Sequence, residues 1–297
     1  MKITLTGSLG HIGKPLTEEL VQKGHTVTVI SSNPEKQKDI EALGAIATIG
    51  PLQDADFLKA TFTGAEAVYC MVPPANYFDH NLDLLAYYQG LGNNYAEAIR
   101  QAGVTRVINL STIGGDMEKG NGILRGAHDL EEILNELPSD VAITHIRPTS
   151  FYYNLFGYAN MIKKSGVIAT NYGDAKIPWV SPTDIAAAVA EEITSQFVGR
   201  KVRYVASEEL TGSESAKILG AAMGMPDLQW IVVSDEETLN GLEAIGMNPK
   251  IAAGLVEMYG ALQTGLLAED YHRNKPAELG KVKLADFAKE FAAALED

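Results

Sequence analysis

Short runs of apolar residues recur at regular intervals through the first half of the chain. They are rich in Val, Ile and Thr, and each has the length of a strand buried on both faces of a parallel sheet. A series of this kind predicts a central parallel β-sheet. The predicted strands cover residues 3–6, 26–31, 45–49, 67–72, 106–111 and 142–146.

Helical patterns of apolar residues alternate with these runs. They cover residues 11–23, 34–43, 55–61, 78–102 and 126–137. Gly24, Gly44 and Gly103 follow three of the helical segments, where a left-handed residue commonly ends a helix. Strands and helices that alternate with short connections form right-handed crossovers. We therefore expect residues 1–150 to form an α/β domain with a Rossmann-type, doubly wound parallel sheet.

The pattern is looser after residue 150. We expect strands at 167–170 and 203–206, and helices at 151–163, 182–195, 213–223, 236–245, 251–264 and 284–295. Residues 151–297 are expected to form a smaller, mainly helical C-terminal lobe for the substrate. Segments within about 182–206 are expected to return to the Rossmann sheet.

The composition of the chain excludes some classes of binding partner. The 297 residues include 24 Lys and Arg against 38 Asp and Glu, which gives a net charge of −14. This charge excludes nucleic acid as a partner, because phosphates are bound by clustered cations. No apolar run is long enough to cross a membrane, and MKITLTG is expected to be a strand rather than a signal peptide. The single cysteine, Cys70, indicates a reduced, cytoplasmic protein, and we expect a small-molecule substrate.

Three glycines open the first unit of the predicted sheet, in TGSLGHIGKPL. Unpaired N–H groups and the positive end of a helix dipole meet at such a turn, where a diphosphate binds if the backbone is bare. The spacing is GxxGxxG, and Leu9 breaks the commoner GxGxxG fingerprint. The position of the loop in an alternating chain indicates nucleotide binding through Gly7, Ser8, Leu9, Gly10, His11, Ile12 and Gly13.

The end of the second predicted strand indicates which nucleotide is bound. An acidic residue there would hold the ribose 2′-hydroxyl of NAD, but residues 30–36 read ISSNPEK. Ser31, Ser32, Asn33 and Lys36 suit a 2′-phosphate better, and they favour NADP over NAD, although no arginine offers a bidentate contact. Ser32 or Asn33 is also placed to cap the following helix.

Six segments resemble one known family when they are taken together and in order. They are GSLGHIGKPL, SSNPEK, AEAVYCMVPP, YAEAIRQAGVTRVINLST, THIRPTSFYYN and IPWVSPTDIA. The set is similar to the NmrA-like family, an atypical branch of the short-chain dehydrogenase/reductase superfamily that includes quinone reductases and nucleotide-sensing proteins. The resemblance covers about residues 1–200.

The resemblance implies a nicotinamide dinucleotide across residues 7–13, with residues 31–36 near the adenosine phosphate. Members of the family often carry an arginine where this chain has Ser32, so the chain departs from the family pattern for NADP at that position. The resemblance also implies contacts beside the adenine ribose, at the tip of the fourth strand, from Val72, Pro73 and Pro74.

The wider superfamily reduces carbonyl groups with Ser, Tyr and Lys, and its tyrosine and lysine form the motif YxxxK. Ser111 and Thr112 end the fifth strand, as the serine should, but the following segment IGGDMEKGNGILRGAHDLEEIL contains no tyrosine. The tyrosine and lysine pair of the YxxxK motif is therefore missing from this segment. His128 is either a proton donor or a surface histidine near a helix N-terminus. None of the six histidines forms HxH or HExxH, so no metal site is predicted.

Aromatic residues follow the sixth strand in RPTSFYYN, and the ends of such strands border the ligand crevice. Tyr152 and Tyr153 are candidates for a substrate pocket in which they sandwich a planar acceptor, or else they anchor the second lobe. Asp184 is interpreted as a charge at a helix N-terminus rather than as a catalyst.

These features together predict an NAD(P)H-dependent oxidoreductase. A quinone or similar planar acceptor can take hydride directly from a nicotinamide and needs no tyrosine acid. The alternative is a sensor that binds the oxidised and reduced cofactor without catalysis, and a weaker alternative is a nucleotide-sugar epimerase. The identity of the acceptor and the oligomeric state do not follow from the sequence.

Overall fold

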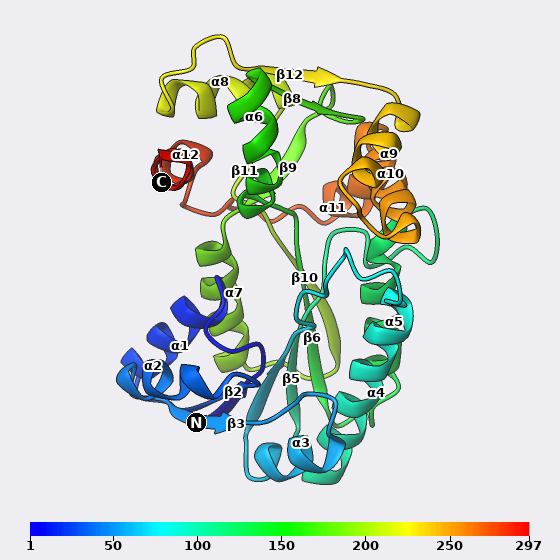
Figure 1. Cartoon of the computed structure of the whole chain (residues 1–297). Coiled ribbons are helices and arrows are strands. Elements are labelled where there is room, and N and C mark those ends of the chain that lie inside the picture. The colour runs from blue at the N-terminus through cyan, green and yellow to red at the C-terminus, as the bar shows by residue number, and fades with distance from the viewer. Residues whose placement is uncertain (297) are drawn as a thin grey trace.

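A seven-stranded parallel sheet is the centre of the computed structural model, which describes residues 1–296 (Figure 1). The order reverses between β1 and β4, which is where open sheets of this kind bind ligands. The predicted Rossmann-type, doubly wound sheet is confirmed. In spatial order its strands are β10 (Arg200–Val205), β6 (Ala142–Pro148), β5 (Arg106–Leu110), β4 (Ala67–Cys70), β1 (Lys2–Leu5), β2 (Thr26–Ser31) and β3 (Ile46–Ile49).

Helices cover both faces of the sheet, and their apolar sides form a buried cluster on each face. Leu16 and Val189 lie in the cluster of the first layer, while Phe62 and Ile99 lie in that of the second. The first layer holds α1 (Gly13–Gln22), α2 (Gln37–Ala42) and α7 (Pro182–Thr194). The second layer holds α3 (Ala55–Phe62), α4 (Leu84–Ala102) and α5 (Arg125–Asn135) (Figure 1).

The C-terminal region lies at the carboxyl ends of the strands, and α7 and β10 return from it to the Rossmann layers (Figure 1). Two small sheets, β11-β9-β7 and β12-β8, stand among its helices. Its elements are β7 (Ser150–Phe151), α6 (Ala159–Ser165), β8 (Val167–Thr170), β9 (Ile177–Val180), β11 (Glu208–Leu210), α8 (Gly212–Ala222), β12 (Gln229–Val232), α9 (Asp235–Ala244), α10 (Pro249–Gln263), α11 (Glu269–Arg273) and α12 (Leu284–Glu296).

The helix predicted to begin at residue 78 begins at Leu84 instead. The side chain of Asp83 accepts a hydrogen bond from Ala86 N–H at 3.0 Å and caps the helix. Before it, Asn76 and Asp79 each accept a bond from a backbone N–H two residues on, at 3.1 and 2.9 Å. Short polar side chains that bond to their own backbone favour turns over helix, which explains the later start.

The helix predicted over residues 151–163 is divided. Residues 150–151 form β7, Tyr152–Tyr158 form a 3-10 helix (η3), and α6 follows. The strands β9, β11 and β12 were not predicted: β9 contains Pro178, β11 begins with two glutamates, and β12 begins with a glutamine, so none is a continuous apolar run.

Within residues 1–296, no single helix is long and apolar enough to span a membrane. The segments Pro249–Gln263 and Leu266–Arg273 reach that length and composition only as a pair, across a bend of 73°.

Candidate functional site

The glycine-rich loop between β1 and α1 lies where the strand order reverses. A Cβ on Gly7, whose φ is +88°, would lie 2.4 Å from Met71 Sδ, and one on Gly13 would lie 2.1 Å from the Ser8 carbonyl oxygen. The positive φ at Gly7 and the backbone carbonyl beside Gly13 therefore favour glycine at both positions. A Cβ on Gly10 would have the Gly7 carbonyl oxygen as its nearest neighbour, 3.8 Å away. The space over Gly10 is open, as the approach of a ligand to the backbone requires.

The N-terminus of α1 has no side-chain cap. Ile12 occupies the cap position, and within residues 1–296 no side chain bonds to the N–H groups of the first turn there. Lys14 N–H donates a hydrogen bond to the Gly10 carbonyl oxygen at 3.0 Å. Pro15 has no N–H, so the N–H groups available at this positive end of the helix dipole are those that precede Lys14, and this open end fits a diphosphate.

The tip of β2 is tied to the glycine-rich loop. Ser8 Oγ donates to Ser31 Oγ at 3.0 Å, and Ser31 Oγ accepts from Asn33 N–H at 3.1 Å. Because Ser31 is buried, its hydroxyl holds the loop in shape. Ser32 and Asn33 are exposed, and they are the side chains at this tip that face solvent.

Lys36 ends the short 3-10 helix η1 (Pro34–Lys36) beside this tip. Its ammonium lies 3.1 Å from Asp39 Oδ2, and about half of each side chain is exposed. An exposed pair of this kind contributes about 0–1 kcal/mol, so Lys36 is free to pair with a ligand phosphate. The predicted cap is Asn33, whose Oδ1 accepts from Glu35 N–H at 2.9 Å.

Hydroxyl groups fix the tip of β4 next to Gly7. Met71 N–H donates to Thr6 Oγ1 at 3.0 Å, and Tyr95 OH donates to the Met71 carbonyl oxygen at 2.7 Å. The side chain of Met71 is also the one that packs against Gly7. The segment that continues from this fixed point holds the three predicted ribose contacts, Val72, Pro73 and Pro74.

A groove of about 610 Å³ joins the glycine-rich loop to the C-terminal region. The loop and α1 form one wall, the start of α7 and Tyr153 form another, and α12 forms the third. The rings of His11 and Tyr153 pack together with their centroids 3.9 Å apart. The groove thus brings a predicted substrate residue next to predicted cofactor residues. Among its lining residues are Gly10, His11, Tyr153, Thr183, Val282 and Phe287.

Tyr152 and Tyr153 project in different directions. Tyr153 is 43% exposed, whereas Tyr152 is fully buried, stacks between Trp179 and Phe287, and donates its hydroxyl to Glu208 Oε1 at 2.7 Å. Successive residues of a 3-10 helix project about 120° apart, so one of the two reaches the groove. The expectation that Tyr152 lines the substrate pocket is corrected, because Tyr152 belongs to the core of the C-terminal region.

Ser111 follows β5, but its hydroxyl donates to Glu131 Oε1 on α5. Arg147, near the end of β6, holds the same carboxylate with two bonds, Nε to Oε1 at 2.9 Å and Nη2 to Oε2 at 2.6 Å. All three residues are buried. The single hydroxyl hydrogen of Ser111 is therefore used inside the protein rather than offered to a substrate.

The other edge of the Arg147 guanidinium reaches the C-terminal region. Its Nη1 donates to Asp270 Oδ2 on α11 at 3.1 Å, and Tyr204 OH donates to the same oxygen at 2.7 Å. Burial by itself lowers the pKa of Arg147, but the hydrogen bonds and charge of Glu131 outweigh it and raise this pKa above its usual value. Sequence reasoning missed this network, since Asp270 lies 123 residues from Arg147 and no local motif marks it.

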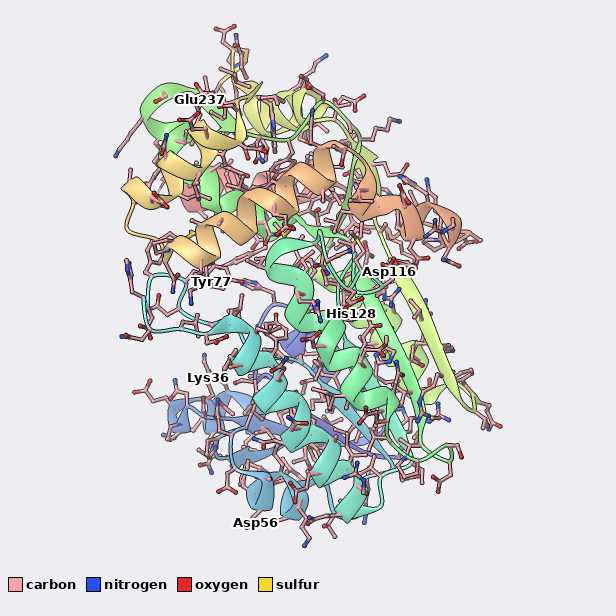
Figure 2. The ribbon with its side chains drawn as sticks, turned by 90° about the vertical axis from the view of Figure 1, so that its right-hand side faces the viewer. Lys36, Asp56, Tyr77, Asp116, His128 and Glu237 are labelled. Carbon is pink, nitrogen blue, oxygen red and sulfur yellow. The ribbon has the colours of Figure 1, made fainter. Side chains whose placement is uncertain are left out.

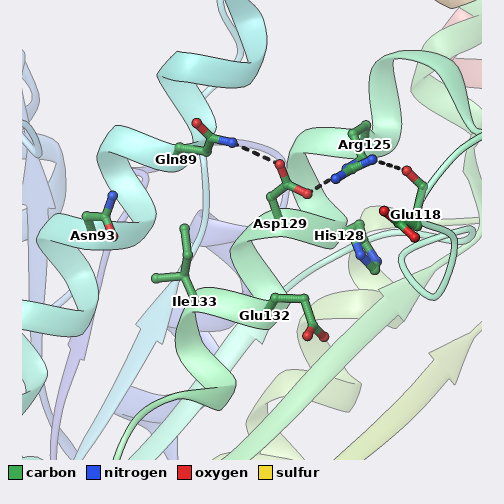
Figure 3. Close-up of a pocket in the computed structure, with 8 residues that line it drawn as sticks. All are labelled: Gln89, Asn93, Glu118, Arg125, His128, Asp129, Glu132 and Ile133. Carbon is green, nitrogen blue, oxygen red and sulfur yellow. Dashed lines mark hydrogen bonds and ion pairs between the residues drawn. The ribbon is translucent and has the colours of Figure 1, made fainter.

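Thr112 is half-buried at the start of the β5–α5 connection, and its carbonyl oxygen accepts from Gly115 N–H at 3.1 Å. His128 on α5 (Figure 2) has Nδ1 2.9 Å from the Gly115 carbonyl oxygen, so that nitrogen donates. The imidazole lines a separate groove of about 570 Å³ between α4 and α5, near the ion pair of Arg125 and Asp129 (Figure 3). His128 is not among the residues that line the groove of the glycine-rich loop.

A family model and one curated relative match this chain over long stretches. The model of the family described as NAD(P)H-binding matches residues 7–196, from the glycine-rich loop to the end of α7. The chain is 24% identical over 295 residues to the NAD(P)H azoreductase of Xenophilus azovorans, and the match covers 98% of each chain.

Two solved structures share the fold over nearly the whole length. An NADPH-dependent quinone oxidoreductase from Escherichia coli, complexed with NADPH, has a TM-score of 0.80 at 21% identity and covers 97% of this chain and 99% of its own. The triphenylmethane reductase of Citrobacter sp., complexed with NADP(H), has a TM-score of 0.77 at 21% identity, with 98% and 99% covered. The chain belongs to the NAD(P)H-binding family, and these similarities are consistent with its resemblance to the NmrA-like, atypical short-chain dehydrogenase/reductase family.

Proposed function

We propose that this protein is an NAD(P)H-dependent reductase that transfers hydride directly to a quinone or a similar planar acceptor. The observation that carries the proposal is the groove in which the open backbone of Gly10 and the exposed ring of Tyr153 lie side by side. One part of this groove suits a diphosphate, and the aromatic part suits a flat, conjugated molecule.

The chain's own residues would form the cradle for the cofactor. The backbone N–H groups that precede Lys14 at the start of α1 would hold the diphosphate, because Gly10 leaves the space over them open and Ile12 leaves them uncapped. Ser32, Asn33 and Lys36 would hold the adenosine phosphate at the tip of β2. When it is bound, a reduced nicotinamide supplies a hydride to an electron-poor acceptor.

On the acceptor side, the protein would bind and orient rather than donate a proton. Tyr153 and Phe287 present aromatic surface to the groove. The segment after β5 has no tyrosine, and Ser111 gives its hydrogen to Glu131. Hydride addition to a quinone gives a hydroquinone anion, which takes its proton from solvent.

The relatives support this class of acceptor. They carry the names azoreductase, quinone oxidoreductase and triphenylmethane reductase, and each matches this chain along nearly its full length. Azo compounds, quinones and triphenylmethane dyes are all conjugated, electron-poor molecules. Acceptors of this kind do not require an acid as strong as a YxxxK pair provides.

NADPH is proposed as the preferred reductant. The tip of β2 has no carboxylate at residues 30–33 and offers two exposed polar side chains, with Lys36 close by. We expect kcat/KM for NADPH to exceed that for NADH about 10-fold, or ~1.4 kcal/mol. Lys36→Met should lower this ratio, whereas the matched control Lys38→Met, on the exposed side of α2, should leave it unchanged.

Steady-state assays test the reductase proposal. Oxidation of NADPH is followed with 2-methyl-1,4-naphthoquinone, an azo dye and a triphenylmethane dye, each against a blank without enzyme. The proposal expects saturable turnover with at least one of them. Tight NADPH binding by calorimetry, with no turnover on any acceptor, would overturn it in favour of a redox sensor.

A further inference from the structure

One wall of the groove depends on a short segment that we call the strap, residues 280–284. It leads directly into α12 and places Val282 and Phe287 against the groove. The strap comes from the C-terminal end of the chain, 97 residues after Asp184 at Lys281, yet it lies on the first turn of α7. What holds it there therefore decides the shape of this wall.

Asp184 binds the strap with both carboxylate oxygens. Its Oδ1 accepts from Lys281 N–H at 3.0 Å, and its Oδ2 accepts from Val282 N–H at 3.1 Å and from Ser207 Oγ at 2.7 Å. A Cβ on Gly280 would lie 2.2 Å from Asp184 Oδ2. The strap thus approaches the carboxylate so closely that residue 280 must be glycine.

These contacts give Asp184 a role beyond that of a charge at a helix N-terminus. The cap of α7 is already made by Ser181, whose side chain accepts from Thr183 N–H at 3.2 Å. The Asp184 carboxylate bonds instead to backbone N–H groups of a distant segment. A carboxylate that accepts such bonds holds its partners more strongly than a neutral acceptor does.

Two further side chains, one of them in the strap itself, hold the strap in place. Lys283 Nζ donates to the carbonyl oxygens of Ser207 and Gly280, both at 2.6 Å. Glu208 accepts from Leu284 N–H and from the hydroxyl of the buried Tyr152. The strap is therefore fixed at both ends, and the Asp184 end is the one next to the groove residues Ser181 and Thr183.

We propose that Asp184 is a positioning residue that fixes α12 as the acceptor wall of the groove. This inference rests on the proposed function, since it assigns the groove to the acceptor. The glycine-rich loop keeps its shape through contacts of its own, between Ser8 and Ser31 and between Gly13 and Ser8. Loosening the strap should therefore weaken acceptor binding and leave cofactor binding unchanged.

The test compares Asp184→Asn and Gly280→Ala with the control Glu191→Gln, which lies on the same helix and pairs with Arg203 away from the strap. In both strap variants we expect the KM for 2-methyl-1,4-naphthoquinone to rise about 10-fold, with kcat and the NADPH Kd changed less than about 2-fold. Hydrogen exchange of a peptide containing Lys281 and Val282 should become faster. The control should change none of these quantities.

Two outcomes would overturn the inference. One is unchanged exchange or an unchanged KM in the two strap variants. The other is a wild-type KM in Asp184→Glu, which keeps the helix charge but shifts the bonding oxygens. If the wild type shows no turnover, the reductase proposal fails separately, and the strap is judged by hydrogen exchange and the calorimetric Kd of the same quinone.

Discussion

Two parts of the same sheet edge are built in opposite ways. Near β1 and β2, glycines leave the edge open, and the N–H groups at the start of α1 have no side-chain cap within residues 1–296. Near β5 and β6, the buried side chains of Ser111, Glu131 and Arg147 fill the edge and bond to one another. The open part keeps its polar groups available for a ligand, whereas the filled part uses them internally.

This difference explains how one edge can serve both binding and stability. The open part is made of backbone, so a ligand meets amides whose positions are fixed by the fold. The filled part connects α5, β6 and α11 through a single guanidinium group. We therefore expect substitutions in the filled part to reduce stability, and substitutions in the open part to reduce cofactor affinity.

The largest effect is expected for Arg147→Met. The substitution leaves Glu131 buried without its bidentate partner, which should lower the free energy of unfolding by about 3–5 kcal/mol. Urea denaturation measures the change. Lys23→Met, which breaks the exposed i,i+4 pair with Glu19 on α1, is the control and should cost about 1 kcal/mol or less. A comparable loss of unfolding free energy in both variants would contradict the assignment of a structural role to the filled part of the edge.

Gly10→Val should have the largest effect on binding. A side chain at this position meets open space in the protein alone, so the melting temperature should stay near that of the wild type. It would occupy the space of a diphosphate, and the NADPH Kd should rise about 100-fold, or ~2.7 kcal/mol. Calorimetric titration measures it. Gly90→Val, at an exposed site on α4 with nothing within 4 Å, is the control and should bind NADPH normally.

The open part could be predicted from the sequence because its signals are local. Gly7, Gly10 and Gly13 lie within residues 7–13, between the end of β1 and the start of α1, and Asn33 caps the next helix two residues after β2 ends. The apolar runs of the sheet are local as well, since β1, β4 and β6 are each buried along most of their own length. Patterns that depend only on neighbouring residues can be recognised in the sequence before the fold is known.

The filled part could not be predicted, because its partners are distant in sequence. Glu131 lies 16 residues from Arg147, and Asp270 lies 123 residues away. The strap meets Asp184 across 97 residues for the same reason. Neighbouring tyrosines were also indistinguishable, since the direction of Tyr152 depends on a 3-10 helix that no periodicity revealed.

Ser111→Ala tests the difference between the open and filled parts of the edge with a smaller expected loss of stability. Loss of one hydrogen bond to the buried Glu131 should cost about 1 kcal/mol of stability. Because the hydroxyl is not available to an acceptor, kcat/KM should change less than about 3-fold. Thermal denaturation and steady-state kinetics measure the two quantities, with Thr112→Val as the neighbouring control. A loss of activity of about 100-fold would place Ser111 in the reaction after all.

The smallest expected effect is a pH dependence of stability from the filled part. His145 on β6 is buried between Asn109 and Asn135, and burial, together with Arg147 and Arg200, lowers its pKa. The folded state keeps the imidazole neutral while the unfolded state takes up a proton below about pH 6.5. Stability should therefore fall as the pH drops below that value, and His145→Gln should reduce the slope. Urea titrations between pH 7.5 and 5, roughly the range around this pKa, measure it with the exposed His272→Gln as control, and an identical slope in wild type and His145→Gln would contradict it.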